Sequence, residues 1–398
     1  MALFVAAALF PVCLFGAIRS APKLLLDSPT LTASEKFVLA QVIAGKSADL
    51  KSEFADETNR VLRAAFLEAL LTQKGTNVHR NGFFIEHAVI LEPLDLHNAE
   101  VHFETSLVGC RFAGEINFSK SIFENGFSLA GSTFASPATF KSAQIIGNLI
   151  FDGSVFVSTN ALINFEEVKV GGVTSFVGCR FAGYVSFKDA KFAALDFSKV
   201  TWPAVHDDNP WLWLNGMTYT RISAGEKDSW QNLYNLVQRT AHGPAYSADI
   251  FARLDEYYRK LGYPRQADTF FRAQKKRERE EVLSGPSWAW SFFLEQFVGY
   301  GRSPERAIFW SVAIIGFGFV MFRPNRMEPQ KSEYVGRKFS PFWYSVDVYL
   351  PIIKLRDAEI WKPKEEYVMT NVWRRIHTIL GWALIPIAIA VWTGMLSH

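Results

Sequence analysis

Few side chains in this chain of 398 residues are arranged as catalytic groups usually are. His97 and His102 each follow an apolar position by one residue, so we expect both on the outer side of the chain, where they could approach one another. Zinc takes three or four protein ligands, and we interpret the two histidines as exposed surface residues. The sequence contains no phosphate-binding loop, no His-Glu-x-x-His motif and no nucleophile elbow. We therefore expect no enzyme activity and no metal or cofactor.

One acidic residue within an aromatic segment is the best candidate for a functional side chain. Residues 339–355 read Phe-Ser-Pro-Phe-Trp-Tyr-Ser-Val-Asp-Val-Tyr-Leu-Pro-Ile-Ile-Lys-Leu and lie between two apolar stretches, as the re-entrant pore helix of two-span ion channels does. Asp347 is the only acid of this segment, and Asp347, Tyr344 and Pro351 are the candidate pore or partner-contact residues. The alternative for Asp347 is an ordinary carboxylate at a membrane interface. A Val-Gly-Tyr-Gly string at 298–301 resembles a channel filter but precedes the first stretch, and we interpret it as coincidence.

Composition limits the remaining function classes. The formal net charge is only +3, which is too small to indicate nucleic-acid binding through bulk electrostatics. With 49% hydrophobic and 20% charged residues, and a mean hydropathy of +0.06, the chain is unusually apolar for a soluble protein. The three cysteines predict no disulfide framework, because Cys110 and Cys179 occupy an inward position and Cys13 lies in the first apolar run.

The elements that would position these residues are indicated by an eleven-residue repeat in the first half of the chain. Bulky apolar residues recur in two interleaved columns, and mostly small residues form a third column two positions before the second. After a three-residue insertion between Ser158 and Asn164 the columns resume, and such regularity indicates stacked units. Ten phenylalanines of the bulky columns are predicted to form the core: Phe112, Phe118, Phe123, Phe134, Phe140, Phe151, Phe156, Phe176, Phe181 and Phe187.

Spacings of five and then six residues between bulky positions do not fit a helix, which requires spacings of three and four. They fit short extended segments joined by tight corners, each segment turning one large side chain inward. Two units would form a coil of about twenty-two residues, which stacks Phe118 on Phe140 and Phe123 on Ile145 at about the 4.8 Å spacing of strands. The sequence therefore predicts a narrow β-solenoid whose ends must be capped.

Two stretches of the repeat resemble a known family. Ser128-Leu-Ala-Gly-Ser-Thr-Phe134 and Phe187-Lys-Asp-Ala-Lys-Phe192 look like degenerate pentapeptide repeats, and the resemblance implies a right-handed four-sided β-helix. Val61 to Leu71, followed by Gly82 to Leu96, resembles the helical lead-in of bacterial membrane-associated pentapeptide-repeat proteins. The chain departs from the family pattern in using eleven residues where two strict repeats have ten.

Five segments are expected along the chain. Residues 1–21 form a signal peptide or an uncleaved anchor, 30–80 a helical cap and 82–202 the β-helix. Residues 227–283 form a helical connector, with apolar residues at helical spacing and a break at Gly262-Tyr263-Pro264. Residues 286–398 form a membrane region with transmembrane helices near 304–322 and 376–396, the second flanked by tryptophans suited to a bilayer interface.

Charge predicts the orientation of this membrane hairpin. Almost no basic residue follows the second stretch, whereas eleven lie between the two: Arg323, Arg326, Lys331, Arg337, Lys338, Lys354, Arg356, Lys362, Lys364, Arg374 and Arg375. The positive-inside rule places this loop in the cytoplasm and the solenoid on the outer, periplasmic side of a cell (inner) membrane. The basic run from Arg272 to Arg279 favours the reverse orientation if it lies near the bilayer.

The pattern supports two functions of different classes. The first is a membrane-anchored, non-enzymatic interaction scaffold that contacts the lipid bilayer and presents a solenoid face to a protein partner. The alternative is a channel-like homo-oligomer with a re-entrant segment near 339–355 that is gated by the solenoid, since an ordered pore requires several copies. Mimicry of duplex DNA, a known role of pentapeptide repeats, requires a strongly acidic face. Residues 85–202 hold twelve acids and eight bases, a net charge of only −4, and we expect no nucleic-acid partner.

Overall fold

The computed structural model describes residues 30–72, 78–203, 211–225, 229–240, 248–350 and 355–392. The chain divides into two compact units, Met1–Ala241 and His242–His398, and each is described by itself. The N-terminal segment predicted to be a signal or anchor, residues 1–21, lies outside the described residues.

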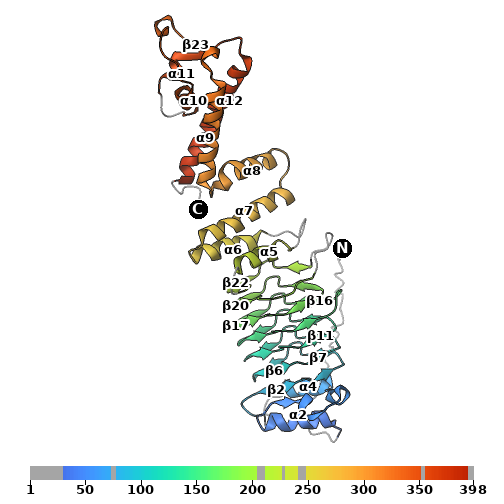
Figure 1. Ribbon diagram of the computed structural model, residues 1–398. Coiled ribbons are helices and arrows are strands. Elements are labelled where there is room, and N and C mark those ends of the chain that lie inside the picture. Colours follow the sequence, from blue (N-terminus) through green and yellow to red (C-terminus); the bar gives the residue numbers. More distant parts are fainter. Residues whose placement is uncertain are drawn as a thin grey trace, which may run out of the picture. The chain divides into compact units, whose positions relative to one another are not determined.

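The first unit is a coil of short parallel strands with four strands per turn (Figure 1). Each strand pairs with its equivalents in the turns before and after it, so four faces run along the coil. The first face contains β2 (Phe83–Glu86), β6 (Thr105–Val108), β10 (Phe127–Ser128) and β14 (Leu149–Ile150). The second contains β3 (Val89–Ile90), β7 (Arg111–Phe112), β11 (Thr133–Phe134), β15 (Val155–Phe156) and β18 (Arg180–Phe181).

The other two faces complete the coil. The third contains β4 (Leu94–Asp95), β8 (Ile116–Asn117), β12 (Ala138–Thr139), β16 (Leu162–Asn164), β19 (Tyr184–Ser186) and β21 (Leu212–Trp213). The fourth contains β5 (Glu100–Val101), β9 (Ile122–Phe123) and β13 (Gln144–Ile145). The longer strands β17 (Lys169–Ser175), β20 (Lys191–Asp196) and β22 (Thr218–Ser223) run along the fourth and first faces and join them into one sheet.

The register of the coil confirms the eleven-residue repeat. Phe123 pairs with Ile145 and Phe112 with Phe134, twenty-two residues apart in each case. Across the insertion the separation becomes twenty-five, as for Phe156 and Phe181, because the three extra residues are accommodated in the corner before β16. The prediction of a β-solenoid combined with helices is confirmed.

Large side chains of the two bulky columns fill the inside of the coil. All ten phenylalanines named above are at most 1% exposed. Phe134 stacks between Phe112 and Phe156 at centroid distances of 5.1 and 4.5 Å, and Phe118 meets Phe140 edge to face at 5.3 Å. Such ring pairs contribute about 0.5–1.5 kcal/mol each beyond the area that they bury.

In each eleven-residue repeat, one corner has a left-handed backbone. It lies two residues after the residue of the first bulky column. Along one edge of the coil this corner is glycine in four successive turns, at Gly109, Gly131, Gly153 and Gly178, with φ between 62° and 70°. Glycine adopts this conformation without a steric penalty. On the opposite edge polar residues adopt it: Asn98, Lys120, Ser142, Glu167 and Asp189. Each eleven-residue repeat has one residue more than two strict pentapeptide repeats, and the regular left-handed turn accommodates it.

Both ends of the coil are covered (Figure 1). The first end carries α2 (Ala33–Ile43), β1 (Ala48–Asp49), α3 (Leu50–Glu53), η1 (Glu57–Arg60) and α4 (Ala64–Thr72), and β1 adds a parallel strand to β2. At the other end the coil continues past Trp202, where the columns predicted its end, through β21 and β22 to α5 (Ser229–Val237). The spacing Leu214, Gly216, Met217, Tyr219 repeats the earlier pattern, but the longer insertion before it hides the register.

The described residues of the second unit form helices and one short antiparallel strand pair. A hairpin of α6 (Asp249–Lys260) and α7 (Pro264–Glu281) breaks at the predicted Gly262–Pro264 turn, and Tyr258 stacks on Phe270 at 5.4 Å. Further along are α8 (Gly285–Val298), η3 (Gly299–Gly301), α9 (Pro304–Met321), η4 (Pro324–Arg326), β23 (Met327–Pro329), η5 (Ser332–Tyr334), α10 (Pro341–Tyr349), α11 (Asp357–Ile360), β24 (Trp361–Pro363) and α12 (Val368–Trp392).

The two expected membrane helices correspond to α9 and to most of α12. Within the described residues, no helix taken singly combines the length and the hydropathy needed to cross a bilayer. Gly285–Gly301 and Glu305–Met321 meet these criteria as a pair, but they are bent by 117° at the break between them.

Candidate functional sites

Asp347 lies in α10 and is held by backbone groups of the segment that follows this helix. Its two carboxylate oxygens accept hydrogen bonds from the N–H groups of Leu355 and Ala358, each at 2.7 Å, and the residue is buried. The carboxylate thereby fixes the start of α11 against α10, as acidic residues at helix N-termini do. This geometry gives Asp347 a structural role.

Tyr344 and Pro351 are the other two candidate residues of the segment 339–355. Tyr344 lies in α10 and is fully buried, with its ring edge to face against Phe322 at 4.9 Å. Pro351 lies outside the described residues. The filter-like string at 298–301 ends α8 and forms η3, a turn with left-handed backbone at Gly299, Tyr300 and Gly301 that leads into α9.

The short helix α10 packs against both long helices through two glycines. A Cβ on Gly318 of α9 would lie 2.2 Å from Ser345 Oγ, and one on Gly381 of α12 would lie 1.9 Å from the carbonyl oxygen of Tyr349. His377 is fully buried between these helices, where Nε2 lies 3.0 Å from the Ser345 carbonyl. Sequence reasoning did not single out His377, although an ionisable residue within a long apolar helix is itself a signal.

One face of the solenoid is hollowed into a groove of about 560 Å³. It crosses β13, β17, β20 and β22 and is lined by the exposed Ile146, by Gly171 and by the register-paired Lys169 and Lys191. The register between β17 and β20 shifts at Gly171 and Gly172. Because neither glycine has a side chain, the surface is recessed at this point. The groove therefore combines apolar surface with two adjacent positive charges.

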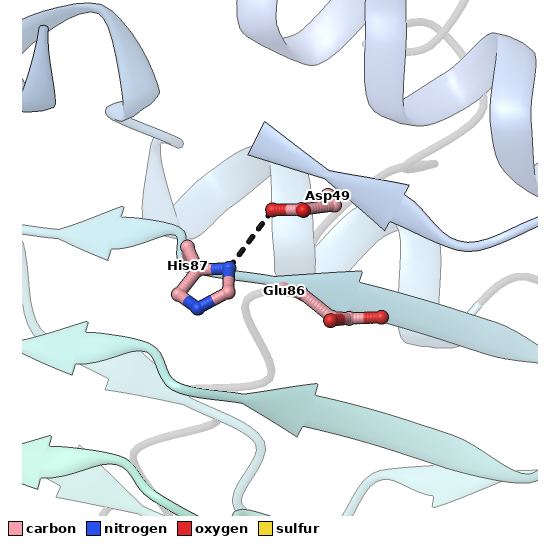
Figure 2. A group of neighbouring side chains, drawn as sticks. All are labelled: Asp49, Glu86 and His87. Atoms are coloured by element: carbon pink, nitrogen blue, oxygen red, sulfur yellow. Dashed lines mark hydrogen bonds and ion pairs between the residues drawn. The ribbon is translucent and has the colours of Figure 1, made fainter. Parts of the chain in front are cut away.

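His97 and His102, the histidines considered from the sequence, do not belong to the cluster of potential metal ligands; His87 does. His102 Nδ1 lies 2.9 Å from Glu124 Oε2. Asp49, Glu86 and His87 instead come together where β1 pairs with β2, and Figure 2 shows the imidazole of His87 directed at the Asp49 carboxylate. His87 Nδ1 lies 2.8 Å from Asp49 Oδ1.

Partial burial acts to raise the pKa of Asp49, but the hydrogen bonds from His87 and from the Lys51 N–H outweigh it and lower the pKa below its usual value. Sequence reasoning missed this cluster because Asp49 and His87 are 38 positions apart. The only available signal was a histidine at a corner that is glycine in the following turns.

Comparison with known proteins supports the repeat. Residues 161–201 match the sequence model of a family described as Pentapeptide repeats (9 copies). The matched residues cover β16 to β20, where four strands form each turn. No curated protein and no solved structure was found to match the chain. The family match and the four-sided solenoid together support the relationship to pentapeptide repeats, a scaffold type of fold.

Proposed function

We propose that this protein is a membrane-anchored β-solenoid that acts as a non-enzymatic interaction scaffold. The observation that carries the proposal is the exposed apolar surface of α9 and α12. On α9, Phe309 and Val312 are 66% and 65% exposed, and on α12, Ile379 is 66% exposed. Patches of this kind on a soluble monomer are rare and indicate a membrane or a partner surface.

The spacing of the exposed residues supports a lipid-facing interpretation. Along α12 they recur at three- and four-residue intervals and therefore form a stripe on one side of the helix. The exposed members of the stripe are Val368, Val372, Ile376, Ile379, Trp382 and Ile389. At 1.5 Å per residue, α9 and α12 are about 27 and 37 Å long, close to or above the thickness of about 30 Å of a hydrocarbon core.

Three polar side chains of α10 and α12 are buried, whereas the charged Arg375 of α12 is exposed. Ser345 of α10 and His377 of α12 are fully buried and Thr370 of α12 is 1% exposed, while apolar side chains of α9 and α12 face outward. In water the opposite distribution is favoured. Polar groups gathered between helices and apolar groups on the outside suit a hydrocarbon environment, in which unsatisfied polar atoms are costly.

The solenoid provides the interaction surface in this proposal. Stacked repeats present extended faces, and the groove that crosses β17 and β20 lies on one of them. Because Lys169 and Lys191 lie side by side next to exposed Ile146, we propose an acidic protein segment with apolar residues as the partner. A fluorescent peptide of alternating glutamate and leucine tests this: Lys169→Glu with Lys191→Glu should weaken its binding, and Lys120→Glu with Lys188→Glu should not.

The channel-like alternative is favoured by one observation, the position of α10 between α9 and α12, with which it packs. A pore would require several copies of the chain arranged around this segment. A detergent-solubilised tetramer that conducts ions in liposomes, and loses conductance on Asp347→Ala, would favour the channel. A monomer or dimer without flux would favour the scaffold.

We propose that the solenoid faces the periplasmic side of a cell membrane, on the strength of the basic loop between α9 and α12.

Membrane attachment itself is tested by fractionating cells that express the full chain and washing the membranes with sodium carbonate. We expect the protein to stay in the pellet. Changing Phe309, Val312 and Ile379 together to lysine should release it, because lysine is costly in hydrocarbon. Lysines at the exposed solenoid residues Ile146, Val157 and Leu91 provide the control and should leave it in the pellet. Recovery of the unaltered chain in the soluble fraction would contradict the proposal.

A further inference from the structure

The cluster of Asp49, Glu86 and His87 lies where the N-terminal cap joins the first turn of the coil (Figure 2). Each residue offers one potential metal-ligand atom, and these atoms all lie within 4.8 Å of one another. All three side chains are half-buried. Among the described residues, this is the one group of three or more histidine, cysteine or acidic side chains with such a spacing. Small movements of the side chains would bring all three ligand atoms into contact with one cation.

The two carboxylates are placed side by side by the backbone. Asp49 and Glu86 are register partners in the parallel pair of β1 and β2, so their side chains leave the same side of the sheet. Like charges at paired positions destabilise a sheet. A positive charge between the two carboxylates would offset this repulsion. The imidazole of His87, the third member of the cluster, points at the Asp49 carboxylate.

The backbone of His87 adds a second observation. Its φ is 58°, a left-handed conformation that is unfavourable for a non-glycine residue, at the corner that is glycine in the next four turns. Gly109, one turn further along, leaves room for the imidazole, because a Cβ there would lie 3.0 Å from Cδ2 and 3.2 Å from Nε2 of His87. The chain therefore places a histidine at a corner that is glycine in the next four turns and lysine, at Lys199, in the turn after them.

Neighbouring groups orient both carboxylates. Ser47 Oγ donates to Glu86 Oε1 at 2.6 Å, and the Lys51 N–H donates to Asp49 Oδ1 at 3.0 Å. Outer-shell hydrogen bonds of this type hold the ligands of metal sites in position and contribute to their affinity. The cluster thus has ligands, spacing and supporting bonds.

We propose that Asp49, Glu86 and His87 form a binding site for a divalent transition-metal cation that ties the cap to the coil. One imidazole and two carboxylates suit Zn²⁺ or Mn²⁺, with water completing the coordination. Because Asp49 and His87 are 38 positions apart, the bound cation closes a long loop and stabilises the folded cap by mass action.

The test uses the full chain, stripped with EDTA and titrated with ZnCl₂ and then MnCl₂ in a calorimeter. We expect saturable binding at one site and a rise in the thermal midpoint that EDTA reverses. His87→Gln and Glu86→Gln should each weaken binding by about tenfold or more, at least the loss caused by removing an outer-shell partner.

Glu86→Gln separates metal binding from the ion pair, because it leaves Asp49 and His87 together and keeps an acceptor for Ser47. His102→Gln is the control, since it removes an imidazole that lies 2.9 Å from the single carboxylate of Glu124 and should leave affinity unchanged. The proposal is overturned if the unaltered chain shows no saturable binding. It is also overturned if Glu86→Gln binds and is stabilised as the unaltered chain is, which would mean that the cluster is only an ion pair.

Discussion

Ser132 and Ser154 lie one above the other in successive turns of the coil, and the Ser132 N–H donates a hydrogen bond to Ser154 Oγ at 3.2 Å. Ser132 Oγ in turn accepts from the Cys110 N–H at 3.0 Å and donates to the Leu107 carbonyl at 2.9 Å. Both serines are fully buried. Cys110, Ser132 and Ser154 of the small column therefore form a ladder of hydrogen bonds that satisfies backbone groups inside the coil.

Replacing Ser132 in this ladder should lower the free energy of unfolding by an amount that depends on the new side chain. Ser132→Ala leaves two buried backbone groups without their partner, which costs about 1–3 kcal/mol. Ser132→Cys should cost less, because Cys110 and Cys179 fill the same column elsewhere. Denaturant unfolding of the full chain, followed by far-ultraviolet circular dichroism, measures both. Equal effects of alanine and cysteine would argue against the ladder.

A charge in the phenylalanine column should disrupt the solenoid. Phe134→Asp removes a ring stacked between two others and buries a carboxylate, so we expect a loss above the about 3–5 kcal/mol of a Phe→Ala change. Ile146→Asp is the matched control, because Ile146 is 63% exposed on the same coil. Limited proteolysis should then cut the Phe134→Asp protein within residues 83–223 and leave the control protein intact. Resistance of both would contradict an inward column.

Packing of the second unit is predicted to depend on Gly318 and not on Gly316, two residues earlier on α9. An alanine Cβ at 318 would overlap Ser345 Oγ and approach His377 Cε1 to 2.9 Å, whereas nothing lies within 4 Å of the Cβ position at 316. Gly318→Ala should therefore lower stability by about 1–3 kcal/mol, the usual cost of overpacking. The thermal midpoint of the detergent-solubilised protein reports the difference. A shift of similar size for Gly316→Ala would show that α10 does not approach α9 this closely.

The N-terminal cap should lose stability in acid through Glu35. Its carboxylate is buried, accepts from the Thr32 N–H at 2.9 Å and pairs with Arg63 at 2.6 Å. Burial acts to raise the pKa of Glu35, but the hydrogen bonds and charge of Arg63 and the Thr32 N–H outweigh it and lower the pKa below 4.5. Because the folded pKa is the lower one, this stabilisation is present above pH 4.5 and is lost as the pH falls further.

Glu35→Gln separates this contribution from general acid unfolding. The variant should be less stable by about 1–3 kcal/mol at pH 7, and the difference from the unaltered protein should shrink below pH 4.5. Protease protection of residues 30–72 measures it. A difference that stays constant down to pH 3 would mean that the carboxylate is not what stabilises the cap.

The solenoid could be predicted from the sequence because its physics is local and periodic. A bulky residue such as Phe140 must point inward at every fifth or sixth position, and twenty-two residues fix which side chains meet. The final turn was missed because the insertion before Leu214 breaks that period. The roles of Asp347 and His87 were not predictable, since each depends on backbone groups or side chains that only the fold brings near.

If α9 and α12 insert in a bilayer, the solenoid and the loop between the two helices lie on opposite sides of the membrane, and single-cysteine labelling measures this. Cys110 and Cys179 are buried, and burial raises the pKa of each thiol to about 12, so both should stay unreactive in the folded protein. In a chain with Cys13→Ser, exposed Ala135→Cys marks the solenoid and exposed Ser332→Cys marks the loop between the two helices. A membrane-impermeant maleimide should label Ala135→Cys in intact cells and Ser332→Cys only after the cells are opened. Labelling of both positions from the same side would contradict the claim.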